Sequence, residues 1–298
     1  MVALLLDAGA DIDARDVDHR ATPAEWMLAQ ARGAGRWELA RDLAERGAAC
    51  DIFLAAALGR TSEAVAMLER DATLLDLQTG SGAYGEQPPS SYHIYFWTIG
   101  SHRSPLDVAA QFGNDETLAA MLPFATSLQR LWLACRRADA GAARQITAQY
   151  PDLISSLPRG AHRAVSDAAW NGEAESVALM LDLGFDPATP GHDSGTALHR
   201  AAWQGSAATV AALLRHLSTS ALINAPDAHH GSTPLGWCCH GSLHGPRDGD
   251  HSGVAQLLLT AGAAPGQFDA SDEVESLVTG WTPPSSHGAN GFSSAVGP

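Results

Sequence analysis

The chain has 298 residues, of which 45% are hydrophobic and 17% are charged. Acidic side chains outnumber basic ones by 33 to 18, and the resulting net charge of −15 repels nucleic-acid phosphates. Lysine is absent, which excludes pyridoxal enzymes, Schiff-base aldolases and Walker-type phosphate loops. No apolar run approaches the roughly 18 residues that a membrane span needs. We therefore expect a protein that binds neither nucleic acid nor a membrane.

The first residues form an amphipathic segment. Residues 2–12 read VALLLDAGADI, which has neither the basic start and cleavage site of a signal peptide nor the composition of a transit peptide. We therefore expect a cytoplasmic protein. The 4 cysteines, two of them adjacent, are too few for a disulfide scaffold and are expected to stay reduced.

Two segments further along repeat with a fixed period. Residues 167–172 read DAAWNG and residues 200–205 read RAAWQG, so Gly172 and Gly205 lie 33 residues apart. The paired alanines permit close helix packing, and the glycine ends each helix in the left-handed conformation. A Thr or Ser start caps several of these helices, and a Pro in their first turn costs no hydrogen bond. The starts are Ser104–Asp107, Thr196–His199 and Thr233–Gly236.

This period and these helix starts resemble the ankyrin repeat family, in a divergent bacterial-type form with an aromatic insertion. The resemblance covers residues 1–265 and implies an all-α solenoid of about seven helix-turn-helix units with short β-hairpin fingers. It also implies that His199 hydrogen-bonds neighbouring backbone. The units are expected at residues 22–48, 52–71, 104–122, 129–150, 162–187, 195–217 and 232–264. Before them, residues 2–12 resemble the second helix of a repeat whose first helix is missing, so the chain opens on a truncated copy or starts further upstream.

An aromatic-rich insertion spans residues 78–102. His93, Tyr95 and Trp97 alternate in it, so in an extended segment they would share one face. The insertion then forms either a lid over a groove or a cover on the flank of the solenoid.

The last part of the chain departs from the repeat in two ways. Residues 242–250 lengthen the turn inside the last full repeat. Residues 266–298 are expected to form a short acidic helix, in which Leu277 and Val278 dock on the last repeat, followed by a disordered tail rich in Gly, Pro and Ser.

In ankyrin proteins, first-helix residues on either side of the paired small residues line a concave groove. The resemblance assigns this role to Phe112, Arg136, Arg137, Asp167, Trp170, Asn171, Arg200, Trp203, Gln204, Trp237 and His240, with Tyr95 and Trp97 added from the insertion. Trp and Arg are the residue types most enriched at binding hot spots, and the arginines would pair with carboxylates of a partner. The alternative is that the tryptophans only pack within the stack.

Two functions follow from this groove. The first is recognition of a protein or peptide partner without catalysis. The second is a small-ligand binder or enzyme in which Asp167 and His240, or His93, act as acid and base under the insertion as a lid. The sequence contains no G-x-S-x-G or H-E-x-x-H motif, and no G-x-G-x-x-G motif that follows a predicted strand.

We expect no cofactor and no metal. The stretch 229–251 is rich in His and Cys, but it has no second ligand pair at zinc spacing. Cys238 and Cys239 occupy the positions of the paired small residues, where a thiol serves as a small buried hydrophobe.

Overall fold

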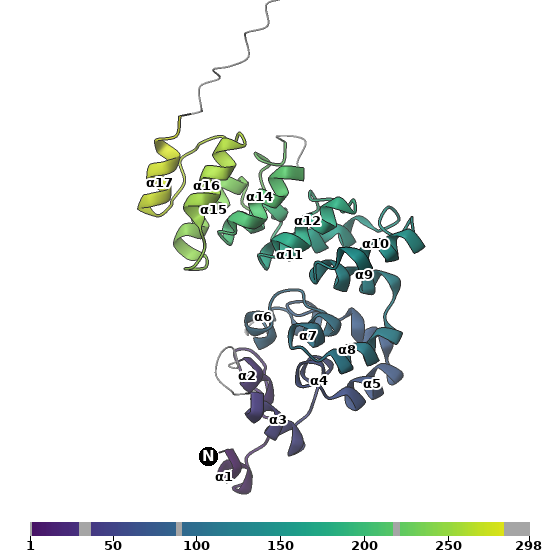
Figure 1. Cartoon of the computed structure of the whole chain (residues 1–298). Coiled ribbons are helices and arrows are strands. Elements are labelled where there is room, and N and C mark those ends of the chain that lie inside the picture. Colours follow the sequence, from purple (N-terminus) through teal and green to yellow (C-terminus); the bar gives the residue numbers. More distant parts are fainter. Residues whose placement is uncertain (1, 30–36, 88–90, 217–220, 283–298) are drawn as a thin grey trace, which may run out of the picture. The chain divides into compact units, whose positions relative to one another are not determined.

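The protein is all-helical in the computed structural model, which describes residues 2–29, 37–87, 91–216 and 221–282 (Figure 1). It divides into two compact units, each with its own core. Unit 1 comprises Met1–Pro158 with Asp182–Gly184, and unit 2 comprises Arg159–Leu181 with Phe185–Pro298. None of the described helices is long and apolar enough to cross a membrane.

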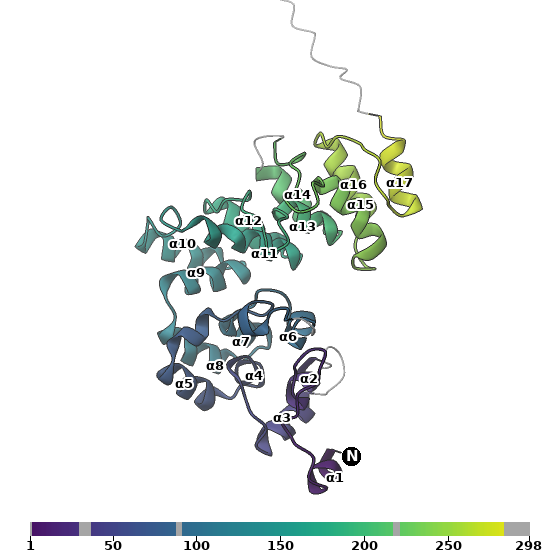
Figure 2. The same ribbon diagram turned by 180° about the vertical axis from the view of Figure 1, so that it is seen from behind.

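Unit 1 is built mainly from helix pairs. In chain order its α-helices are α1 (Val2–Asp7), α2 (Pro23–Ala29), α3 (Trp37–Glu45), α4 (Ile52–Leu58), α5 (Thr61–Arg70), α6 (Ile94–Thr98), α7 (Pro105–Gln111), α8 (Asp115–Met121), α9 (Ser127–Arg136) and α10 (Ala140–Gln149). Short 3-10 helices lie at Ala72–Asp76, Gly82–Tyr84 and Leu122–Phe124. Successive partners pack as α2 with α3, α4 with α5, α7 with α8 and α9 with α10. The pairs then stack, because α4 contacts α7 and α5 contacts α8 (Figure 2).

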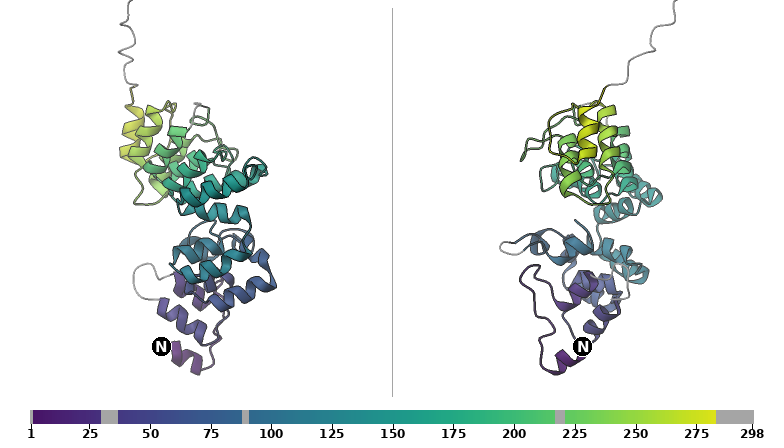
Figure 3. Two further views of the ribbon diagram at one scale, coloured as in Figure 1. Left: turned by 45° about the vertical axis from the view of Figure 1, so that its right-hand side comes forward. Right: turned by 90° about the vertical axis from the view of Figure 1, so that its left-hand side faces the viewer.

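Unit 2 repeats this plan in two layers. After a 3-10 helix at Arg159–Arg163, its α-helices are α11 (Ala164–Trp170), α12 (Ala174–Asp182), α13 (Ala197–Trp203), α14 (Ala207–His216), α15 (Pro234–His244), α16 (His251–Thr260) and α17 (Asp272–Thr279). The first helices α11, α13 and α15 pack side by side in one layer, and α14 packs on α16 in the other. Helix α17 packs on α16 at the end of the unit (Figure 3).

Local signals explain where these helices begin and end. Capping boxes start α7 at Ser104, α9 at Thr126 and α13 at Thr196. The box Thr126–Gln129 is a start signal that the search for Thr-Pro-Leu motifs missed. As predicted, a left-handed glycine follows several first helices, at Gly59, Gly113, Gly172 and Gly205. Ala138 takes this place after α9, with φ 51°.

The predicted β-hairpin fingers are absent from the described residues, where no strand forms. The connections are compact turns instead, such as the one closed by the Asp227 amide donating to the Ser232 carbonyl at 2.9 Å. A turn whose polar atoms are satisfied by a local carboxylate needs no paired strands, since every backbone donor already has an acceptor.

The insertion at 78–102 is not extended, which corrects the prediction that His93, Tyr95 and Trp97 share a face. Its base is closed because the Thr79 amide donates to the Arg103 carbonyl at 3.1 Å. The aromatic segment forms α6, and helical spacing directs Tyr95 and Trp97 differently: Tyr95 is fully buried and Trp97 is 56% exposed. Residues 88–90 of the insertion lie outside the described residues.

The C-terminal part of unit 2 contains the acidic segment and the second insertion. The acidic segment forms α17, whose Val274 and Val278 are buried, whereas Leu277 is half-buried. The first residues of the second insertion extend α15 to His244, and the loop that follows packs on the turn after α13. Residues 30–36 of the unit expected at 22–48 and residues 283–298 of the expected tail lie outside the described residues.

Candidate functional site

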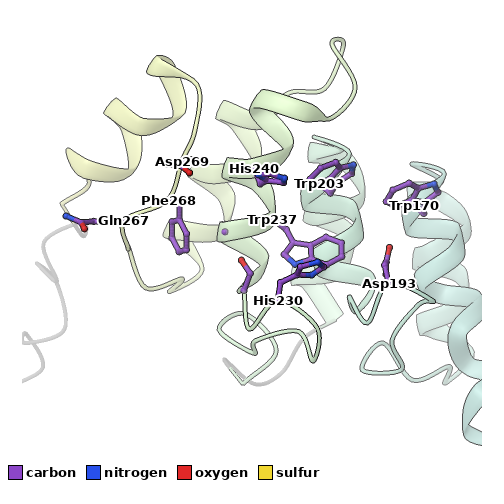
Figure 4. Close-up of a pocket in the computed structure, with 11 residues that line it drawn as sticks. Trp170, Asp193, Trp203, His230, Trp237, His240, Gln267, Phe268 and Asp269 are labelled. Atoms are coloured by element: carbon purple, nitrogen blue, oxygen red, sulfur yellow. The ribbon is translucent and has the colours of Figure 1, made fainter.

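A cavity of about 580 Å³ lies on the first-helix layer of unit 2. Helices α11, α13 and α15 and the segment after α16 contribute its walls (Figure 4). The lining residues are Trp170, Asp193, Trp203, His230, Ser232, Gly236, Trp237, His240, Gln267, Phe268 and Asp269. We call this cavity the aromatic pocket. Three of the predicted groove tryptophans and His240 therefore meet in one site.

Trp237 is anchored at the base of the pocket by Asp227. The indole Nε1–H donates to Asp227 Oδ2 at 3.0 Å, and the backbone amides of His229, His230 and Ser232 donate to the same carboxylate. Burial alone would raise the pKa of Asp227, but the hydrogen bonds from the His230 backbone and the Trp237 indole outweigh it and hold this pKa well below its usual range. Asp227 is thus a structural anion that fixes the ring of Trp237.

Trp203 and His240 form the next part of the wall. Their ring centroids lie 5.2 Å apart, and Trp203 also meets Trp237 edge-on at 6.3 Å. The end of α13 is held because His251 Nε2 donates to the Trp203 carbonyl at 2.9 Å. Figure 4 shows these rings between Phe268 on one side and Trp170 with Asp193 on the other. Edge-on and tilted arrangements leave ring faces open to the cavity.

Arg200 does not face a partner, which corrects its predicted role. Its Nη1 donates to Asp167 Oδ1 at 2.8 Å and its Nε to Asp193 Oδ2 at 3.2 Å, and the residue is 3% exposed. The guanidinium carbon lies 4.8 Å from the centroid of the Trp170 ring. Arg163 pairs with the other oxygen of Asp167 at 3.3 Å. These ion pairs stabilise the wall of the pocket and are not directed at a bound ligand.

The same ion pairs surround Asp167, one of the two residues of the acid–base alternative. Asp167 is 2% exposed and bound by two arginines, and it does not line the aromatic pocket. His240 does line the pocket and is exposed. Asn171 and Gln204 cap the ends of α11 and α13 and are also absent from the lining. The pocket therefore contains one member of the predicted pair without the other.

Phe268 is a wall residue that sequence reasoning missed. The segment carrying Gln267, Phe268 and Asp269 lies beyond the last repeat, so no repeat position pointed to it. Gly236 makes room for it inside α15, since a Cβ there would lie 3.0 Å from the Phe268 ring. A glycine within a helix is otherwise unfavourable by about 1 kcal/mol relative to alanine. A glycine at this helical position was therefore the sequence signal that another group lies close to the backbone of α15.

The remaining predicted residues lie in unit 1. Arg136 is committed to internal contacts, because its Nε pairs with Asp107 at 3.2 Å and its Nη2 donates to the His102 carbonyl at 2.8 Å. Phe112 packs against Trp37 with ring centroids 4.6 Å apart. Arg137 is exposed. Of the three arginines predicted to meet a partner, only Arg137 presents its side chain to solvent.

Tyr95 and His93 are also internal, so of the two alternatives for the insertion, the lid is wrong for both side chains. Tyr95 donates its hydroxyl to Asp51 Oδ1 at 3.2 Å. His93 is 3% exposed, and its Nε2 lies 3.6 Å from Glu25 Oε2. Helix α6 of the insertion packs on α2, so the insertion is part of the core packing of unit 1.

The histidines and cysteines of unit 2 serve packing and capping. His199 is buried, its Nε2 donates to the Ser232 carbonyl at 3.1 Å, and its Nδ1 accepts from Thr196, as the resemblance implied. Burial raises the pKa of Cys239 to about 11, and Cys238 is buried as well. Among the described residues, no group of three or more His, Cys, Asp or Glu is placed to hold a metal ion.

The turn that anchors Trp237 occurs a second time, in unit 1. Residues 16–26 read DVDHRATPAEW and residues 227–237 read DAHHGSTPLGW. In unit 1, the indole of Trp26 donates to Asp16 Oδ2 at 2.8 Å, as Trp237 does to Asp227. We call this arrangement the Asp-His-Trp turn. Sequence reasoning missed it because the shared residues are spread over eleven positions.

The two copies of the Asp-His-Trp turn differ in what covers them. In unit 1, the insertion lies on the turn: His19 Nδ1 donates to the Tyr92 carbonyl at 3.0 Å, and the Ser91 amide donates to the Asp18 carbonyl at 2.7 Å. In unit 2, the corresponding His230 side chain is 67% exposed and borders the aromatic pocket. One copy is therefore occupied by the chain itself, and the other is open.

Comparison with known families finds no family model that matches the chain, and no curated protein matches it.

Proposed function

We propose that the protein is an ankyrin-type repeat module for recognition, and that the aromatic pocket of unit 2 binds a segment of a partner protein. The repeat assignment is supported by the 33-residue spacing of Gly172 and Gly205 and by their shared left-handed conformation. It is also supported by the capping box of Thr196 and His199. The stacked helix pairs of each unit fit such a repeat.

The observation that carries the recognition function is the difference between the two Asp-His-Trp turns. In unit 1, an irregular segment of the chain lies on the turn and offers the Tyr92 carbonyl to His19. In unit 2, the same turn lies beside an open cavity, with the His230 side chain exposed. His230 Nδ1 already contacts Asp227 Oδ1 at 3.2 Å, so a partner segment in an irregular or extended conformation would place its backbone at His230 Nε2 and a side chain in the pocket.

The composition of the pocket favours binding over catalysis. Its walls are aromatic rings on helices, which provide rigid apolar area with few rotatable bonds. The acid proposed for catalysis, Asp167, accepts from Arg163 and Arg200 and stays behind the wall. An acid–base mechanism would need it on the surface of the pocket, within reach of a substrate proton.

Selection from a library of random peptides against the full-length protein tests this function. Trp203→Ala removes a wall of the pocket, and Trp97→Ala removes an exposed tryptophan of unit 1 as the matched control. We expect enriched peptides that bind the wild type and Trp97→Ala alike and lose at least about tenfold in affinity for Trp203→Ala, the loss of a hot-spot side chain. Peptides that bind Trp203→Ala as well as the wild type, or no enriched peptide, would overturn the proposal.

A further inference from the structure

The charged residues that line the aromatic pocket are acidic, whereas the sequence predicted arginines that pair with carboxylates of a partner. No arginine lines it, because Arg200 is turned into the wall, whereas Asp193 and Asp269 are both lining residues. The Asp193 side chain remains 32% exposed while it accepts from Arg200. Asp269 is exposed and forms no ion pair with any residue in the described part of the chain. The pocket thus offers carboxylates and ring faces, but no fixed cation, to its occupant.

The contacts of Arg200 show that a tryptophan and an aspartate can together bind a guanidinium in this unit. Its guanidinium lies over the ring of Trp170 and pairs through Nε with Asp193. A cation within about 6 Å of a Trp centroid is attracted by the negative face of the ring, and the attraction grows as water is excluded. The wall of the pocket therefore already contains one guanidinium bound by a tryptophan and an aspartate.

We propose that the aromatic pocket takes an arginine side chain of the partner segment, with its guanidinium against the faces of Trp203 and Trp237 and paired with Asp269. This inference rests on the proposed function, because it names the side chain that the bound segment supplies. Asp269 and Phe268 are neighbours on the segment after α16, and both line the aromatic pocket together with these rings (Figure 4).

Arginine fits better than lysine or a carboxylate for three reasons. Guanidinium is planar, stacks on aromatic faces and is more weakly hydrated than an ammonium, so it loses less on entering an apolar pocket. The net charge of −15 attracts a cationic segment and repels an acidic one. A carboxylate side chain would meet Asp193 and Asp269 with no free cation among the lining residues.

The test compares N-acetyl-L-arginine methylamide with its citrulline counterpart, which has nearly the same shape without the charge. Binding to the full-length protein is followed through the indole N–H signals in ¹H–¹⁵N spectra. We expect saturable shifts with the arginine compound and about tenfold weaker binding of the citrulline compound, as a cation–π contact with one ion pair would produce. Added salt should weaken only the arginine compound.

Variants locate the effect. Asp269→Asn should weaken the arginine compound several-fold and leave the citrulline compound unchanged. Asp152→Asn, which removes the charge of an exposed aspartate in unit 1, should change neither. Trp203→Ala should abolish the shifts of both compounds. Equal binding of the two compounds, or equal effects of Asp269→Asn and Asp152→Asn, would overturn the inference.

The two proposals fail in different ways. Library peptides that depend on Trp203 but contain no arginine would retain the recognition function and overturn the arginine preference. Binding of the arginine compound without any Trp203-dependent peptide would overturn the recognition of a partner segment and leave a site for a small cation. Arginine-containing peptides that lose affinity in both Trp203→Ala and Asp269→Asn would support both.

Discussion

Trp237 donates its indole N–H to Asp227, and this bond fixes one of the three indole rings of the pocket to a turn at the start of α15. Because the carboxylate also accepts three backbone amides, the ring and the turn are held by one buried charge. The geometry of the aromatic pocket therefore depends on a residue that does not line it.

The first prediction concerns the ionisation of Asp227. Its pKa is lowered in the folded state, so the carboxylate contributes stability that is full above the unfolded value of 3.8 and is lost as the pH falls below it. Asp227→Asn should destabilise the protein by about 1.5–3 kcal/mol at pH 7, because the bonds to a charged acceptor become bonds to a neutral one. Urea unfolding of both proteins should show this gap closing as the pH falls below about 3.8. A gap that stays constant with pH would contradict the assignment.

The second prediction concerns the buried pairs of Arg200. Arg200→Ala should destabilise unit 2 by about 3–5 kcal/mol, since it leaves the buried Asp167 without its closest cation. Arg137→Ala, at an exposed arginine of α9, should cost less than about 0.5 kcal/mol. Urea unfolding at neutral pH measures both. Similar losses in the two variants would show that Arg200 is not the structural residue inferred here.

The third prediction compares the loss of a buried and of an exposed aromatic side chain of the insertion, Tyr95 and Trp97. Burial raises the pKa of Tyr95 well above its usual range, so the phenol stays protonated and donates to Asp51. Tyr95→Phe should destabilise unit 1 by about 1–3 kcal/mol, because Asp51 loses a donor in a buried site. Trp97→Ala should have a smaller effect, since this ring is 56% exposed. Thermal and urea unfolding test the order, and the reverse order would support an exposed lid.

The fourth prediction concerns the end of α9. Ala138 has φ 51°, a conformation that costs a residue with a Cβ about 1–2 kcal/mol and costs glycine little. Ala138→Gly should stabilise unit 1 by about 0.5–1 kcal/mol once the larger freedom of glycine in the unfolded chain is subtracted. Gly113→Ala is the reciprocal control: φ is 72° and no atom lies within 4 Å of the added Cβ, so backbone strain alone should destabilise it. Opposite shifts in the urea midpoint are expected, and shifts of the same sign would contradict this account.

Much of the fold was predictable because its signals are local. The left-handed glycines Gly172 and Gly205 and the capping box at Thr196 each mark a helix end through atoms a few residues apart. The all-helical class followed from these signals and is confirmed in the described residues. The β-hairpin fingers were inherited from the family resemblance, and the compact turns of this chain do not form them.

The candidate site was predictable in part. Trp170, Trp203 and His240 each follow the paired small residues of a first helix, and Trp237 precedes such a pair, so the 33-residue spacing together with the ankyrin resemblance predicted that they line one surface. The repeat spacing did not predict Phe268, because this residue lies beyond the last predicted repeat. It also did not predict the Asp-His-Trp turn, because the shared residues of this turn are spread over eleven positions.

What the sequence by itself determined is the all-helical class, several helix ends and the equivalent positions of Trp170 and Trp203, because these depend on short-range geometry and a fixed period. Only the tertiary structure decided which charges remain available: Arg136 and Arg200 pair inward with Asp107, Asp167 and Asp193, while Asp269 faces the pocket. Ion pairing depends on the distance between groups from different helices. That distance is set by packing, so the sequence predicted Trp170, Trp203, Trp237 and His240 for the pocket, but not that its lining carries aspartates and no arginine.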